Sequence, residues 1–220
     1  MFTVVFDLDG TLADTSADLI AAANACFRGL GHGDLLDPGQ DALTAFHGGR
    51  AMLRLGFSRL GIEDDALVGS QYAPLLAAYA EGIDTHTRLY PGAVEAVLAL
   101  REGGYRTAIC TNKPEGLAEL LLTRLGVRGL FDSLIGADTL PTRKPDVAPY
   151  VASVLRAGGD PRRSLLVGDT ETDRRTAEAA GVPCILVSFG PEGAGIARLA
   201  PTAMLDDYAD LPGLVERLRG

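Results

Sequence analysis

The sequence predicts an α/β fold, in which helices cover a parallel β-sheet and an all-helical segment is inserted near the start of the chain. From residue 90 onward, short apolar runs rich in β-branched residues alternate with stretches of helical periodicity. Such alternation produces a parallel sheet with right-handed crossovers. Residues 14–86 show helical periodicity and no convincing strand. Residues 3–6, ahead of this insert, form a continuous apolar run typical of a strand buried on both faces.

The insert is expected to hold four helices, at residues 16–29, 38–47, 50–60 and about 64–80. Ser16 can cap the first of them. Asp37 followed by Pro38 predicts the N-cap and first position of the second. The pair Gly48-Gly49 then breaks the helical pattern before the third.

The remaining strands and helices follow in alternation. Strands are expected at residues 106–110, 133–136, 165–167, 184–187 and 203–205. Helices are expected at residues 91–103, 115–125, 147–157, 172–180 and 211–218, with a loop and short helix in 190–200. Because the first strand belongs to the same sheet, we expect a core domain of residues 1–13 with 87–220 and an insert of residues 14–86.

The composition excludes several classes of protein. A hydrophobic fraction of 47% and the lack of long polar tracts indicate a globular protein. No apolar run approaches the roughly 20 residues of a membrane span, and no leader pattern is present, so a cytoplasmic location is expected. The net charge of −9 argues against nucleic acid or an anionic membrane as partner. Three widely spaced cysteines, Cys26, Cys110 and Cys184, are expected to be reduced core residues.

Two carboxylates follow the first strand. Side chains alternate along a strand, so Asp7 and Asp9 leave its end in roughly the same direction. Carboxylates this close repel each other, and one tends to stay protonated unless a cation lies between them. The pattern therefore predicts a divalent metal, an acid/base pair, or both. Taken alone, Asp-x-Asp-Gly is also compatible with an ordinary turn.

Further polar residues follow other predicted strands. Residues 111–113, Thr-Asn-Lys, follow the second strand, and Asp169 with Asp173 follows a later one, while Lys144 lies in a separate loop. In open parallel sheets, functional groups collect beyond the carboxyl ends of the strands. Carboxylates, a hydroxyl, an amide and an ammonium group at one edge suit Mg²⁺ and a phosphoryl group. The chain has 20 basic residues and only two are lysines, Lys113 and Lys144; Lys113 is expected to be exposed or to act indirectly.

With these groups in order, the sequence resembles the haloacid dehalogenase superfamily, and specifically its phosphatases with a helical, C1-type cap inserted after the first motif. The four matching motifs are Asp7-x-Asp9-Gly10-Thr11, Thr111, Lys144, and Gly168-Asp169 with Asp173. The likeness covers essentially the whole chain. It implies a three-layer, Rossmann-like parallel-sheet core with an inserted all-helical cap domain.

The resemblance also implies roles for individual residues. Asp7 would be the nucleophile that forms an aspartyl-phosphate, and Asp9 the general acid and then the general base. Mg²⁺ would be held by Asp7, the backbone carbonyl of Asp9, and Asp169, with Asp173 in support. Lys144 would neutralise charge between Asp7 and the phosphoryl group. The phosphate would be bound by Gly10, Thr11, Thr111 and the amide of Asn112.

Within the superfamily the sequence is most similar to phosphoglycolate phosphatases. The likeness lies in core segments: residues 90–92, 110–114, 143–145 and 167–182. It implies a magnesium-dependent phosphomonoesterase acting on a small phosphate ester, with 2-phosphoglycolate as the expected substrate and a monomer or homodimer as the expected assembly. The substrate specificity would come from cap residues His47, Gly48, Gly49 and Arg50. A Gly-Gly helix break beside a solvated arginine explains this segment equally well.

Alternatives remain open at this point. Asp9 argues against a dehalogenase, which has no leaving alkoxide to protonate. A phosphonatase would need a lysine in the insert, which has none. A β-phosphoglucomutase-like phosphomutase, a phosphatase of another small sugar phosphate, and a catalytically silent binding protein all stay compatible with the sequence.

Overall fold

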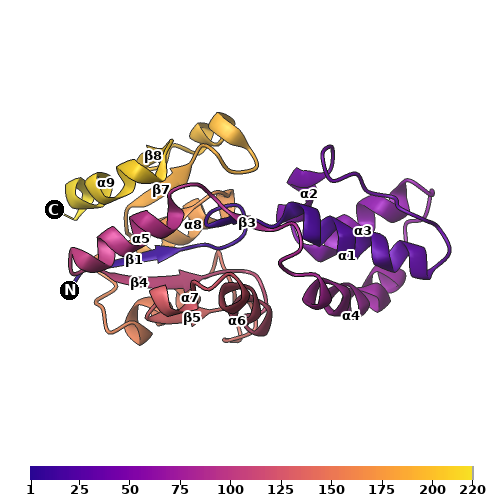
Figure 1. The fold of residues 1–220 in the computed structure, drawn as a ribbon, viewed down its shortest axis with the longest axis horizontal. Coiled ribbons are helices and arrows are strands. Elements are labelled where there is room, and N and C mark those ends of the chain that lie inside the picture. The colour runs from indigo at the N-terminus through magenta and orange to yellow at the C-terminus, as the bar shows by residue number, and fades with distance from the viewer. Residues whose placement is uncertain (220) are drawn as a thin grey trace. The chain divides into compact units, whose positions relative to one another are not determined.

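The computed structural model describes residues 1–219, and the chain divides into two compact units. Met1–Ala13 and Leu89–Gly220 form one, here called the core unit, and Asp14–Arg88 form the other, the cap unit. The core unit contains the large sheet and the cap unit contains the first four helices (Figure 1).

The core unit is built on a six-stranded sheet in the order β5-β4-β1-β6-β7-β8. All of its strand pairs are parallel. The strands are β1 (Thr3–Phe6), β4 (Arg106–Cys110), β5 (Ser133–Ile135), β6 (Ser164–Gly168), β7 (Cys184–Val187) and β8 (Ala203–Leu205). This arrangement confirms the expected α/β class, and the strand bounds differ from the expected ones by at most one residue.

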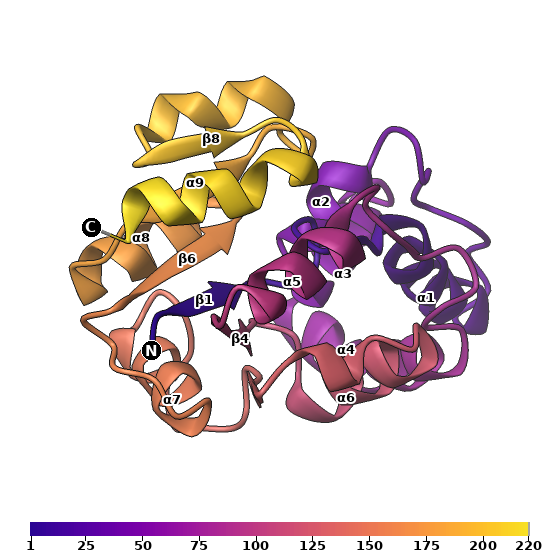
Figure 2. The same cartoon turned by 60° about the vertical axis from the view of Figure 1, so that its left-hand side comes forward.

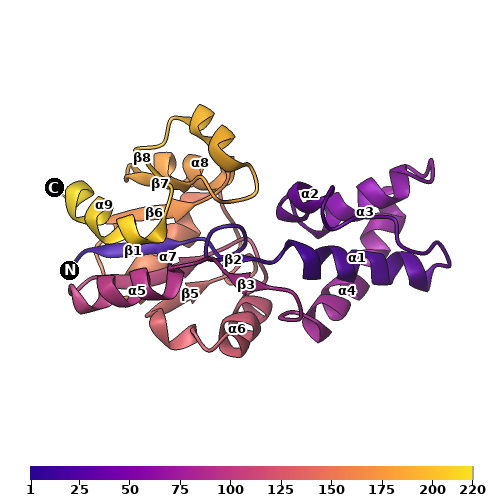
Figure 3. The ribbon, with the colours of Figure 1, turned by 45° about the horizontal axis from the view of Figure 1, so that its top comes forward.

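Helices cover both faces of the sheet, giving three layers (Figures 2 and 3). They are α5 (Ala93–Glu102), α6 (Glu115–Arg124), α7 (Val147–Arg156), α8 (Glu171–Ala180) and α9 (Leu211–Leu218), with 3₁₀ turns η1 (Arg128–Leu130), η2 (Gly193–Leu199) and η3 (Tyr208–Asp210). On the face covered by α7 and α8, Val5 and Leu166 pack with Tyr150 in one buried cluster. Because the central strands are buried on both sides, most of their side chains are apolar, and the polar ones lie at or near the strand starts.

The cap unit consists of α1 (Ser16–Gly29), α2 (Ala42–Phe46), α3 (Gly49–Ser58) and α4 (Asp65–Glu81). The helices α1 and α3 meet where the rings of Phe27 and Phe57 pack edge to face, with centroids 5.2 Å apart. Gly56 permits this approach, because a Cβ there would lie only 2.1 Å from the Phe27 ring. The expected helical insert is therefore present.

Two helix starts in the cap unit differ from the expectation. The second helix begins at Ala42 and not at residue 38, because Asp37 accepts hydrogen bonds from the backbone of Gly39 and Gln40 and holds a turn there. Ser16 is the first residue of α1 and not its cap; its hydroxyl and amide both donate to Asp14. Short polar side chains compete for such local contacts, which the apolar pattern does not reveal.

A second, two-stranded sheet was not expected. Strands β2 (Ala13–Asp14) and β3 (Arg88–Leu89) pair where the chain passes from one unit to the other. Two residues are too few to show alternation in a sequence. The three cysteines are buried and unpaired, as expected. Within residues 1–219, every helix is too short or too polar to cross a membrane.

Candidate active site

The site lies at the carboxyl ends of three adjacent strands of the core unit. Asp7 follows β1, Thr111 follows the neighbouring β4, and Asp169 follows β6 on the other side. The amide of Asp7 donates to the carbonyl of Val167 at 2.9 Å, so the hydrogen-bond ladder between β1 and β6 continues to Asp7 itself. The sheet therefore fixes where the backbone of Asp7 lies.

Lys144 joins two of the carboxylates. Its Nζ lies 3.0 Å from Oδ2 of Asp7 and 2.6 Å from Oδ1 of Asp173, and its side chain is almost completely buried. Burial alone lowers the pKa of Lys144, but the charges of Asp173 and Asp7 outweigh it and raise that pKa overall. The lysine is therefore a permanent cation next to Asp7.

Asp7 is buried, and burial is the main reason why its pKa rises from 3.8 to about 6. The charges of Asp173 and Asp9 add to the rise, and Lys144 opposes it. Its Oδ1 accepts a hydrogen bond from the amide of Leu8 at 2.7 Å. The Asp7 carboxylate is thus more basic than a surface aspartate and remains next to a cation.

Asp169 has one oxygen held and one oxygen without a protein partner. Its Oδ1 accepts from the hydroxyl of Thr11 at 2.7 Å. Its Oδ2 is buried and has no hydrogen-bond partner among residues 1–219. Burial, together with the charges of Asp173 and Asp7, raises the pKa of Asp169 well above its usual range. Such an orphaned carboxylate oxygen is costly unless a cation occupies the position next to it.

Asp173, in contrast, is already satisfied. Its Oδ2 accepts from the hydroxyl and amide of Thr170, at 2.7 and 3.1 Å. The contact with the amide, together with the hydrogen bond from the amide of Asp173 to the hydroxyl of Thr170, forms a capping box at the start of α8. Its Oδ1 is bound to Lys144. With both oxygens used, Asp173 is suited to orienting Lys144.

The cluster fits a divalent metal. Asp7, Asp169 and Asp173 each have a carboxylate oxygen in a group whose members all lie within 4.8 Å of one another. All three residues are buried. Hard oxygen donors of this kind suit Mg²⁺, and the orphaned Oδ2 of Asp169 is the position that most needs a cation.

Asp9 pairs with the second lysine. The Nζ of Lys113 lies 2.8 Å from both carboxylate oxygens of Asp9. The Lys113 side chain is 3% exposed, so an exposed position for this residue was wrong. Lys113 reaches Asp9 because β4 and β1 are neighbours, which places the loop after one strand beside the loop after the other.

The segment after β4 is fixed by its own hydrogen bonds. Thr111 is buried, and its hydroxyl accepts from the amide of Lys113 at 3.2 Å. Asn112 is exposed, and its side chain donates to the carbonyl of Lys144 at 3.1 Å. Asn112 thus ties the loop after β4 to the loop that carries Lys144.

The four cap residues lie together at the junction of α2 and α3, all within the cap unit. His47 ends α2, and Gly48 has φ of 94°, which explains the break between the helices. Gly49 begins α3. The guanidinium of Arg50 lies over the ring of Tyr72, 4.5 Å from its centroid.

Tyr208 supports the site, and sequence reasoning did not identify it. Its buried hydroxyl donates to the carbonyl of Thr11 at 2.8 Å, and its ring packs on Phe189. Thr11 in turn donates to Asp169, so Tyr208 stabilises the loop that holds this carboxylate. A contact across 197 positions leaves no local signal in a sequence. For Lys113 the sequence did offer a signal, because the chain has only two lysines among its 20 basic residues.

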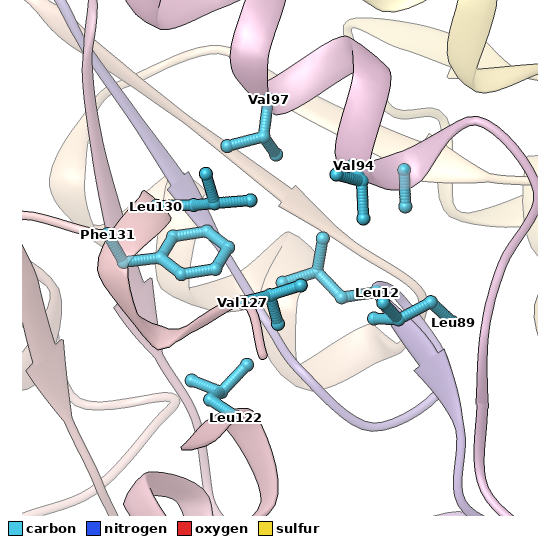
Figure 4. A pocket seen from close by; sticks show the side chains of 9 residues that line it. Leu12, Leu89, Val94, Val97, Leu122, Val127, Leu130 and Phe131 are labelled. Carbon is cyan, nitrogen blue, oxygen red and sulfur yellow. The ribbon is translucent and has the colours of Figure 1, made fainter. Parts of the chain in front are cut away.

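A separate apolar cavity has no part in this site. Its volume is about 10 Å³, and it lies in the core unit among the side chains of Leu12, Val97, Leu122 and Phe131 (Figure 4). Every lining residue is apolar. A cavity this small and without polar groups cannot bind a phosphate, and we interpret it as a packing defect.

Gly10 provides a first test of the geometry around Asp169. Its φ is +80°, and a Cβ there would lie 2.2 Å from Oδ2 of Asp169. We expect Gly10→Ala to weaken binding of Mg²⁺ roughly 10- to 100-fold, because the methyl group displaces this carboxylate. The measurement is a Mg²⁺ titration of the unfolding temperature.

The matched control is Gly158→Ala, since Gly158 has nearly the same φ, +78°, but open space around the added Cβ. Both variants should lose about 1 to 2 kcal/mol of stability from the strained backbone alone. If Gly10→Ala binds Mg²⁺ as tightly as Gly158→Ala does, Gly10 does not limit the position of Asp169.

Comparison with known proteins agrees with this geometry. Residues 4–187 match the family of haloacid dehalogenase-like hydrolases. The chain is 37% identical over 218 residues to a phosphoglycolate phosphatase of Agrobacterium fabrum, covering 97% of this chain and 92% of that protein. It is 38% identical to a phosphoglycolate phosphatase of Rhodospirillum rubrum, covering 94% and 88%. A crystal structure of a predicted phosphoglycolate phosphatase from Haemophilus somnus superimposes with a TM-score of 0.86 at 26% identity, covering 97% of each chain. The chain therefore belongs to the haloacid dehalogenase-like hydrolases.

Proposed function

We propose that the protein is a divalent-metal-dependent phosphomonoesterase that acts on 2-phosphoglycolate through an aspartyl-phosphate intermediate. The hydrolase class follows from the family, and the names of the relatives place the chain with phosphoric monoester hydrolases. The observation that carries the mechanism is the position of Asp7, a buried carboxylate 3.0 Å from the ammonium of Lys144. A carboxylate can attack an anionic phosphate only where cations screen their repulsion.

In the first step an oxygen of Asp7 attacks phosphorus, and the bond between phosphorus and the ester oxygen breaks. Asp9 donates a proton to the leaving alkoxide. In the second step Asp9 takes a proton from water as the water attacks the aspartyl-phosphate, which restores Asp7 and releases inorganic phosphate. Lys144 stabilises the negative charge on Asp7 and on the phosphoryl oxygens during both steps. Gly10, Thr11, Thr111 and the amide of Asn112 bind the phosphoryl group.

Mg²⁺ is the proposed metal, held by Asp7, Asp169 and the backbone carbonyl of Asp9. When bound, it neutralises charge on the phosphoryl oxygens and on the carboxylates. Asp173 supports the site by holding Lys144.

The proposal of 2-phosphoglycolate as substrate rests on the names of the relatives, which align along nearly the whole chain. A phosphomutase remains the alternative. A putative β-phosphoglucomutase from Thermotoga maritima has the same fold, with a TM-score of 0.73, but its 21% identity supports no more than the fold. The role of His47, Gly48, Gly49 and Arg50 in substrate choice stays a prediction.

The test is release of inorganic phosphate from 2-phosphoglycolate, p-nitrophenyl phosphate and several sugar phosphates, with Mg²⁺ and with chelator. We expect Mg²⁺-dependent release and a clear preference for 2-phosphoglycolate. Release of phosphate only from the other esters would support a phosphatase activity but exclude 2-phosphoglycolate as its substrate. Conversion of one sugar phosphate into another without phosphate release would favour the mutase.

Arg50→Gln should raise KM for 2-phosphoglycolate and leave KM for p-nitrophenyl phosphate unchanged if the cap prediction is right.

A further inference from the structure

We propose that Lys113 is a positioning residue, which holds the carboxyl group of Asp9 in place for proton transfer to the leaving group and, later, from the attacking water. The inference rests on the proposed function, because it assigns Lys113 to the proton-transfer half of that mechanism. Lys144 forms an ion pair with the proposed nucleophile Asp7, and Lys113 forms one with Asp9. The only two lysines of the chain are thereby divided between the two aspartates of the first motif.

The geometry of the ion pair between Lys113 and Asp9 fits this role. Nζ of Lys113 lies 2.8 Å from Oδ1 and 2.8 Å from Oδ2 of Asp9. Equal contact with both oxygens fixes the rotation of the carboxyl group as well as its position. The Lys113 side chain is buried, while that of Asp9 is 19% exposed. The lysine therefore contacts Asp9 from the protein interior, and part of the Asp9 side chain stays accessible.

Lys113 is itself anchored by its backbone. Its amide donates to the hydroxyl of Thr111 at 3.2 Å, and its carbonyl accepts from the amide of Ala137 at 2.9 Å. Because Thr111 follows β4 and Asp9 follows β1, the ion pair joins a proposed phosphate-binding loop to the loop of the first motif. A side chain anchored in this way can hold another group within the tolerance that proton transfer requires.

The distribution of charge also favours a positioning role for Lys113. Four aspartates meet at this end of the sheet, and Lys144 contacts Asp7 and Asp173. Without Lys113, Asp9 would lose a cation that lies against both of its oxygens. The repulsion between Asp9 and Asp7 would then lose the cation that offsets it on the side of Asp9.

The experiment compares Lys113→Met with wild type on two esters that differ in their need for a proton donor. The alkoxide of 2-phosphoglycolate leaves poorly unless it is protonated, whereas p-nitrophenolate leaves readily as an anion. Single-turnover release of the alcohol, with enzyme in excess, isolates the first step for each ester. We expect a fall of about 10²-fold for 2-phosphoglycolate and at most about threefold for p-nitrophenyl phosphate.

Two further variants separate positioning from structure. Lys113→Arg should recover part of the lost rate, because a guanidinium also contacts both carboxylate oxygens. Lys113→Gln replaces Lys113→Met if thermal unfolding shows that the methionine variant is not folded. Arg128→Met removes an ion pair with Glu119 elsewhere in the core unit, and it should leave the ratio of the two rates unchanged.

A double-mutant cycle tests whether Lys113 acts through Asp9. Lys113→Met combined with Asp9→Asn should be no slower on 2-phosphoglycolate than Asp9→Asn alone. Additive losses, equal slowing of both esters, or a change confined to KM for 2-phosphoglycolate would each overturn the inference. If wild type is inactive on both esters, the proposed function fails; if wild type is active and Lys113→Met matches it, only the inference fails.

Discussion

Replacing Asp7 by asparagine is expected to abolish phosphate release, with a loss of at least about 10⁴-fold in kcat. The amide keeps the shape of the side chain but cannot form the aspartyl-phosphate. Lys144 keeps its contact with Asp173, and Thr11 keeps its contact with Asp169, so the loss is assigned to the missing nucleophile and not to a collapsed site. The measurement is the rate of phosphate release with saturating Mg²⁺ and substrate.

The same substitution should stabilise the metal-free protein at neutral pH. The pKa of Asp7 is about 6 in the folded protein and 3.8 as its ordinary value, so folding favours the protonated carboxyl. The stabilisation that Asp7 gives is complete below pH 4 and is lost as the pH rises through 6. Asparagine does not ionise, and at pH 8 the variant should therefore be more stable than wild type by about 3 kcal/mol.

Thermal unfolding in chelator at pH 4 and pH 8 tests this result. The two proteins should unfold at similar temperatures at pH 4 and diverge at pH 8, and added Mg²⁺ should stabilise wild type more than the variant. The control is Asp160→Asn, which alters an exposed carboxylate of the same unit that is paired with Arg162. Equal stability of wild type and Asp7→Asn at pH 8 would show that burial of Asp7 is not costly, and residual phosphate release would exclude it as the nucleophile.

The sequence predicted the sheet well because its strands are buried on both faces. A continuous apolar run such as residues 3–6 or 184–187 has a clear start and end, and the structure follows those limits. The positions of two candidate site aspartates were predictable for the same reason, since Asp7 and Asp169 directly follow such runs. At Asp37 the local side-chain contacts form a turn, and the prediction of Asp37 and Pro38 as N-cap and first helical position placed the helix start four residues too early.

Contacts between side chains far apart in the chain could not be predicted from the sequence. Lys113 meets Asp9 across 104 positions, and Tyr208 meets Thr11 across 197, and only the order of strands and layers brings these pairs together. The sequence also left open which oxygens of the carboxylates are free. In the structure, Thr170 and Lys144 contact both oxygens of Asp173, whereas Thr11 contacts one oxygen of Asp169 and leaves the other without a partner among residues 1–219.

Lys144→Met is expected to cause the largest loss of stability, because it leaves the buried carboxylates of Asp7 and Asp173 without their shared cation. Breaking a buried ion pair by removing one partner costs about 3 to 5 kcal/mol. For a chain of this length that corresponds to a fall of roughly 6 to 20 °C in the unfolding temperature. Phosphate release should also be lost, since the cation next to the nucleophile is gone.

The double variant Lys144→Met with Asp173→Asn separates the two effects. Removing the charge of Asp173 should restore more than half of the lost stability, because the amide can still accept from Thr170 at the start of α8. Activity should not return, since Asp7 would still face the phosphoryl group without an adjacent ammonium. Arg128→Met, which breaks the partly exposed pair with Glu119, should change stability by less than about 1 kcal/mol. A Lys144→Met protein as stable as Arg128→Met would mean that the carboxylates take up protons instead, and that this lysine is needed for catalysis alone.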